Sequence, residues 1–176
     1  MFQKKYIFAI IMLVSLLFSG LLSPVHAQSL NIEEVSSLEG QHPSEYFKRA
    51  NTLFQQGQKD EAVFVYYVAQ LRYRTYVGAR PNLPPDQDPA LLSSLMATMG
   101  PSINQYAFGD LPRLIKTIDA VLAYGSRQQD TLTPRAQYPQ AHKSVRSGLM
   151  QLKNHIVKDG KSIRAERSAG GLENRM

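Results

Sequence analysis

The chain of 176 residues contains no cysteine. This absence excludes a disulfide scaffold, a cysteine-based zinc or iron–sulfur site, and a thiol nucleophile. Low-complexity segments and collagen-like repeats are absent as well. Hydrophobic residues make up 43% of the chain and charged residues 19%, values that are typical of a folded globular protein. The length corresponds to one domain with short extensions.

Recognisable catalytic motifs are also absent. The sequence contains no nucleophile elbow, no zinc-protease helix motif, no dinucleotide-binding glycine loop and no phosphate-binding loop. His142 and His155 lie about 20 Å apart on one expected helix, so they cannot share a metal ion. Asp88 and Asp110 stand where helices begin, and we expect them to cap those helices. We therefore expect no metal, no cofactor and no enzyme. The alternative is an exported, hydrolase-like enzyme in which a carboxylate and Tyr106 act outside any recognisable motif.

Residues 1–27 resemble a secretory signal peptide. Lys4 and Lys5 precede an uncharged apolar run over residues 6–22, and a proline and a small residue follow it at Pro24 and Ala27. We expect cleavage between Ala27 and Gln28, which would place the mature protein in the periplasm or outside the cell. The alternative is a retained membrane anchor, because a run of 17 residues is the lower limit for spanning a bilayer.

The rest of the chain is predicted to be all-α, because no segment alternates convincingly with a period of two. A polar arm (28–42), which contains His42, precedes one helical domain (43–160), and a flexible basic tail (161–176) follows it. Apolar residues at helical spacing and Gly or Pro breakers predict five main helices, over about 44–57, 59–77, 88–99, 110–125 and 140–158. Gly100 and Pro101 are expected to end the third helix. The uninterrupted apolar run over residues 62–69 places the second helix at the centre of the bundle.

The two expected helices within residues 43–74 carry small, leucine and aromatic residues at regular spacing, namely Ala50, Leu53, Gly57, Ala62, Tyr66 and Ala69. This spacing resembles that of a single tetratricopeptide-type helical hairpin, a 34-residue pattern. Tyr46 stands where the family usually has Trp, and Arg74 stands in place of its closing Pro. A second copy cannot be aligned. The resemblance implies a helical groove that binds a peptide or a helix of a partner protein.

Tyrosine and arginine, the residue types that concentrate binding energy at interfaces, suggest a partner-binding surface. Arg72, Tyr73 and Tyr76 lie on the second expected helix, and Asn104 and Tyr106 lie in the connection that follows Gly100. These five residues are the candidate binding site; the alternative is that they pack in the core.

The predicted function is that of an exported protein-binding module, such as an adaptor or inhibitor, whose partner is another envelope protein or peptide. The net charge of +6 falls to +4 when Lys4 and Lys5 are removed (18 basic minus 14 acidic residues). That modest charge predicts no nucleic-acid partner. We also expect the basic tail to make weak contact with an anionic membrane surface.

Overall fold

The computed structural model describes residues 35–175, and this part of the chain is an all-α bundle. Its five helices are α3 (Ser44–Gln55), α4 (Lys59–Gly78), α5 (Asp88–Ala107), α6 (Leu111–Arg127) and α7 (Pro139–Ala169). Within this range there is no strand, and no helix is long and apolar enough to cross a membrane. The expected fold class is therefore confirmed. The expected signal peptide (1–27) and residues 28–34 of the arm lie outside the described residues.

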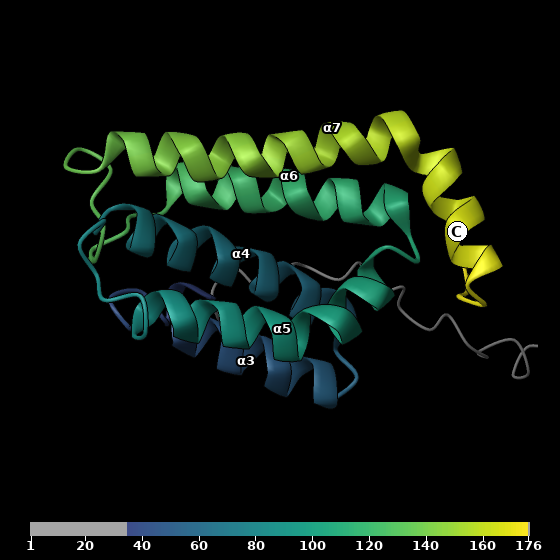
Figure 1. The fold of residues 1–176 in the computed structure, drawn as a ribbon, viewed down its shortest axis with the longest axis horizontal. Helices are drawn as coiled ribbons and strands as arrows, with labels where there is room; N and C mark the ends of the chain where they lie inside the picture. Colours follow the sequence, from purple (N-terminus) through teal and green to yellow (C-terminus); the bar gives the residue numbers. More distant parts are fainter. Residues whose placement is uncertain (1–34, 176) are drawn as a thin grey trace, which may run out of the picture.

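Helix α4 forms the centre of the bundle, as its sequence predicts. It packs against each of the other four helices, and in Figure 1 it runs between α6 and α7 on one side and α3 and α5 on the other. The whole apolar run over residues 62–69 is buried. A helix that is apolar on nearly every side can bury all of that surface only at such a central position.

The first two helices form a tight hairpin. Gly57, in the three-residue turn between them, has a φ of +82°, a left-handed conformation that glycine adopts without steric cost. Phe47, Ala50 and Leu53 of α3 are buried, and α3 packs extensively against α4. The hairpin is thus present, while its membership of the tetratricopeptide type stays a prediction.

Pro101 does not end the third helix, contrary to the sequence-based expectation. Helix α5 continues through Gly100 and Pro101 to Ala107. A proline inside a helix costs about 3 kcal/mol. That cost is offset here because Ile103 and Ala107, beyond the proline, are buried against the core. Asn104 and Tyr106 consequently lie on the last turn of a helix and not in a loop.

The last helix is longer than expected. Helix α7 does not stop at Gly160 but reaches Ala169, and its final part bends round the end of the bundle (Figure 1). Gly160 lies close to the start of α6, where an added Cβ would lie 3.3 Å from Leu111. Beyond the helix, the Arg175 N–H donates to the Gly109 carbonyl at 2.6 Å. Much of the segment expected to be a flexible tail is therefore helical and contacts the bundle.

Buried tyrosines should make the fold sensitive to alkali. Burial raises the pKa values of Tyr46, Tyr66, Tyr67 and Tyr73 above the ordinary value of 10. In the unfolded chain these groups ionise near pH 10, whereas in the folded chain they ionise only at higher pH. The free energy of unfolding should therefore fall as pH rises above 10, by at most about 1.4 kcal/mol per pH unit for each such tyrosine. Well below pH 10 these tyrosines should not make the free energy of unfolding depend on pH.

A pH titration followed by tyrosinate absorbance and by far-UV circular dichroism checks this prediction. The main rise in tyrosinate absorbance should coincide with the loss of helix. Complete ionisation of the tyrosines in a chain that keeps its helical signal would contradict it.

Candidate functional site

Arg72 of α4 lies in the interior and not on a binding surface. Only 5% of its side chain is exposed. Its guanidinium forms ion pairs with Glu39 (Nη2–Oε2, 2.9 Å) and Asp130 (Nη1–Oδ2, 3.0 Å), and it also donates to the Gln129 carbonyl. The aromatic ring of Tyr124 lies 5.4 Å from the guanidinium carbon. Arg72 therefore holds the segment before α3 and the loop after α6 against the central helix.

Tyr73 is also buried, and Tyr76 is half-buried beside it. The Tyr73 hydroxyl donates to Asp88 Oδ1 at 2.8 Å. Both tyrosine rings contact the His42 imidazole edge-on, with centroid distances of 5.3 and 5.4 Å. The Arg80 guanidinium stacks over Tyr76 at 3.9 Å. These contacts join the start of α3, the end of α4 and the start of α5.

Asn104 and Tyr106 lie near the opposite end of α4. Asn104 accepts a hydrogen bond from the Tyr67 hydroxyl at 3.1 Å, and the Tyr106 hydroxyl donates to Asp60 Oδ1 at 3.0 Å. Asp60 and Tyr76 are sixteen residues apart on α4, which corresponds to about 24 Å along the helix axis. The five predicted binding residues therefore do not form one surface. The structure buries Arg72 and Tyr73, and it places Tyr76 far from Asn104 and Tyr106.

The structure reveals an open groove that the sequence reasoning did not identify. Its floor is α4, and its walls are Leu92 of α5 and one side of α7. We call it the α4 groove, lined by Tyr67, Gln70, Leu71, Arg74, Val77, Gly78, Leu92, Ser144, Val145, Gly148, Leu149 and Leu152, with a volume of about 580 Å³. Arg74 is its one charged lining residue, and most of the others are apolar or small. Grooves of this kind between helices accept the apolar face of a partner helix or peptide.

Gly148 keeps the α7 wall of the groove low. A Cβ added at this position would meet no atom within 4 Å. Glycine in the middle of a helix costs about 1 kcal/mol relative to alanine, and packing inside this chain does not require it here. Ser144 lies one turn earlier on the same wall. This pair of small residues beside the apolar seam of Val145, Leu149 and Leu152 was the available sequence signal for the groove.

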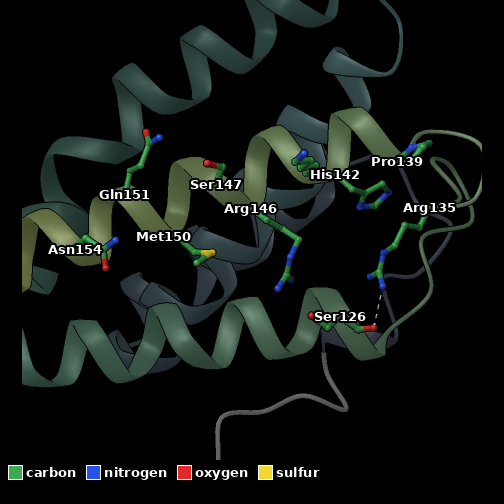
Figure 2. A pocket seen from close by; sticks show the side chains of 10 residues that line it. Ser126, Arg135, Pro139, His142, Arg146, Ser147, Met150, Gln151 and Asn154 are labelled. Atoms are coloured by element: carbon green, nitrogen blue, oxygen red, sulfur yellow. Dashed lines mark hydrogen bonds between the residues drawn. The ribbon is translucent and has the colours of Figure 1, made fainter.

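A second recess lies between α7 and the end of α6, and its charge is entirely positive. Figure 2 shows Arg146 of α7 and Arg135 of the preceding loop reaching toward the end of α6 near Ser126. Arg146 Nη1 donates to the Leu122 carbonyl at 2.8 Å, and Arg135 donates to the carbonyls of Gly125 and Ser126. Cations in this position complement the negative end of the helix dipole. Lys143 adds a third cation, and no acidic residue lines the recess.

His42, Ser44 and Asp88 include the residue types of a serine-hydrolase triad. Ser44 Oγ lies 2.8 Å from His42 Nδ1, and His42 Nε2 lies 3.0 Å from Asp88 Oδ1. The Ser44 backbone N–H also donates to Nδ1 at 3.3 Å, so the imidazole satisfies the start of α3. The recess that Asp88 lines includes neither Ser44 nor His42. We interpret the chain of contacts as a structural link between α3 and α5. Asp88 is the first residue of α5, and Gln87 stands at the N-cap position. The expectation that Asp88 caps this helix is therefore wrong.

Two other carboxylates converge, but they face an arginine. Asp60 pairs with Arg113 Nη1, and Asp110 pairs with Arg113 Nε at 3.2 Å. Asp110 also caps α6, as the sequence predicts, by accepting the Arg113 N–H at 2.9 Å. The adjacent cavity of about 10 Å³ has room for one water molecule. Among residues 35–175, no three His, Asp or Glu side chains are placed to hold a metal ion.

Comparison of the chain with protein-family models, with curated proteins and with solved structures gives no match.

Proposed function

We propose that the protein is an exported, non-catalytic binding module that holds a helical segment of another envelope protein in the α4 groove. The observation that carries the proposal is the groove itself, which is open, largely apolar and bordered by a wall that Gly148 keeps low. The resemblance of residues 43–74 to the tetratricopeptide hairpin, a peptide-binding type, agrees with this role. An adaptor and an inhibitor would both use such a groove.

The chemistry of the lining indicates what kind of segment would bind. Leu71, Leu92 and Leu152 offer apolar contacts, and the half-buried Met96 of α5 lies beside the groove, where Arg74 donates to its sulfur at 3.2 Å. Methionine side chains adapt to irregular partners. Arg74 is exposed and makes no ion pair with any residue of the described range. We therefore propose an amphipathic partner helix that carries an acidic residue opposite Arg74.

The enzymatic alternative assigns catalysis to a carboxylate and Tyr106, and an open cleft with two convergent acidic residues would favour it. The Tyr106 hydroxyl donates to Asp60, and both residues line the small cavity at Arg113. Asp60 and Asp110 converge on Arg113, where a cavity of about 10 Å³ leaves no space for a substrate. This arrangement favours binding over catalysis.

Export is the second part of the proposal, and N-terminal sequencing of the exported product should find Gln28 as its first residue. A product that keeps residues 1–27 would contradict that part alone.

Filling the groove at Gly148 is the matched test of the binding proposal. Gly148→Leu should keep the protein folded, because leucine favours a helix more than glycine does and the added atoms enter open space. The same substitution at Ser162, which is exposed on the same helix but lines neither the groove nor the recess, serves as the control: Ser162→Leu leaves the groove open.

Each tagged variant is used as bait in an envelope extract, and the amount of captured partner is compared. The control variant should capture as much partner as the unsubstituted chain does. Gly148→Leu should reduce capture by about tenfold or more, since a filled groove excludes the partner helix. Circular dichroism confirms the folding of both variants. Equal capture by both variants, or no specific capture by the unsubstituted chain, would contradict the proposal.

A further inference from the structure

One side of α7 carries an exposed stripe of five residues, the first four of which also line the recess beside the end of α6. Lys143, Ser147, Met150, Asn154 and Val157 follow one another at intervals of four, three, four and three residues, and all five are exposed. This spacing places them on one face of the helix. We call these five residues the α7 outer face. It is distinct from the α7 wall of the groove, which consists of Ser144, Val145, Gly148, Leu149 and Leu152.

Two large apolar side chains lie on this face. Met150 is 51% exposed and Val157 is 62% exposed, and with Leu91 they are the exposed large hydrophobic residues of the described range. They are two turns apart, about 10 Å along the helix. Single exposed apolar residues are common, so these two residues support an interaction surface only together with the cations that flank them.

The cations around the face have no acidic partners within the described part of the chain. Arg72, Arg113 and Lys153 each form ion pairs inside the bundle. Lys143, Arg146 and Lys158, in contrast, form none with any described residue, and neither does Arg135 across the recess. Arg135 and Arg146 are also held in place by carbonyls of α6, and Figure 2 draws the bond from Arg135 to Ser126. The negative end of the α6 dipole balances part of this charge, while the exposed Arg135 and Lys143 keep the recess positive toward solvent.

A helical face with exposed apolar residues between lysines and arginines matches an anionic membrane surface. We propose that the α7 outer face docks onto anionic phospholipid, with Met150 and Val157 in the headgroup layer. Lys143, Arg146 and Lys158 lie beside lipid phosphates, and the recess at Arg135 receives a headgroup phosphate. Membrane contact thus comes from the middle of α7, separately from the contact expected for residues 161–176. The α4 groove, on the other side of α7, stays open in this arrangement, and the inference does not depend on the proposed function.

Vesicle flotation of the full chain tests the proposal. Residues 6–22 are apolar and would bind any bilayer, so the readout is the excess binding to phosphatidylcholine vesicles that contain one quarter phosphatidylglycerol over binding to pure phosphatidylcholine. Lys143→Gln with Lys158→Gln should lower this excess affinity by roughly 10- to 30-fold, since each cation near an anionic surface contributes about fivefold. Lys48→Gln with Lys59→Gln removes the same charge from α3 and the start of α4 and should change it less than about threefold.

The apolar part of the face needs its own variant. Met150→Ser with Val157→Ser keeps every charge, alters only exposed positions and should weaken the excess binding by about fivefold or more. Equal losses in the two lysine pairs would show a general charge effect and overturn the docking face. If added inorganic phosphate abolished vesicle binding at constant ionic strength, the recess would be a site for a free anion and not for a lipid headgroup. An excess that the serine pair leaves unchanged would also contradict the proposal, and the face would then fit an acidic protein better than a bilayer.

Discussion

Replacement of Arg72 by alanine is expected to lower the free energy of unfolding by about 3–5 kcal/mol. The substitution removes a buried guanidinium but leaves the Asp130 carboxylate, whose side chain is only 9% exposed, without its ion-pair partner. An uncompensated charge in such a position is strongly destabilising. Glu39 loses its contact as well, so the segment before α3 is released from the central helix. Chemical denaturation followed by circular dichroism measures the change.

Arg74 provides the matched control for this prediction. It lies on the same helix two residues later, but it is exposed and forms no ion pair with a described residue. Arg74→Ala should therefore change the free energy of unfolding by less than about 1 kcal/mol. If Arg72→Ala cost no more than this control, the buried ion-pair network would not hold the ends of the bundle together.

The second large effect is expected at Tyr66. Its side chain is fully buried at the centre of α4, where it contacts the Phe47 ring edge-on at a centroid distance of 5.6 Å. Its hydroxyl would lie 2.9 Å from a Cβ added at Gly100, so α5 approaches it closely. Tyr66→Ala should cost about 3–5 kcal/mol, because the cavity it leaves lies between α3, α4 and α5.

The conservative variant separates the packing of the Tyr66 ring from the interaction of its hydroxyl with Asn104. Tyr66→Phe keeps the ring and should retain most of the stability, with a loss of about 1 kcal/mol. The midpoints and slopes of chemical denaturation give the free energies of unfolding of both variants. A loss below 1 kcal/mol for Tyr66→Ala would show that the site collapses or is not central.

The central helix was predictable because its evidence is local. Eight consecutive apolar residues over 62–69 could form a buried strand or a central helix, and the apolar pattern that continues to Val77 favours the helix. As a helix, this run can be fully buried only at the centre of a bundle, and the structure places it there. Asp110 was predictable as a cap for the same reason, since its acceptor and the Arg113 N–H are three residues apart. In contrast, the continuation of α5 through Pro101 depends on the burial of Ile103 and Ala107 against other helices. The rule that Gly and Pro end helices considers only neighbouring residues, so it cannot include the stabilisation from this burial.

The candidate site was harder to predict, because its residues are defined by contacts between distant parts of the chain. Arginine is a residue type that is common in binding sites. The ion-pair partners of Arg72, however, are Glu39 and Asp130, which are 33 and 58 residues away in sequence, and these pairs lie in the interior. Tyr76 and Tyr106 are both half-buried tyrosines, yet they lie toward opposite ends of α4. The groove lies along α4 between Leu92 of α5 and one side of α7. The small residues Ser144 and Gly148 on its α7 wall were its one signal in the sequence.

Site-specific photo-crosslinking from the groove tests the central claim most directly. A photoreactive phenylalanine analogue at Ser144, inside the groove, should yield one specific adduct with an envelope protein, and the cross-linked peptide should be an amphipathic helix with an acidic residue. The same analogue at Ser162, exposed on the bent end of α7 and outside the groove, should not yield that adduct. Gly148→Leu should abolish the Ser144 adduct. An identical adduct from both positions, or one that survives Gly148→Leu, would contradict the assignment of the α4 groove as the binding site.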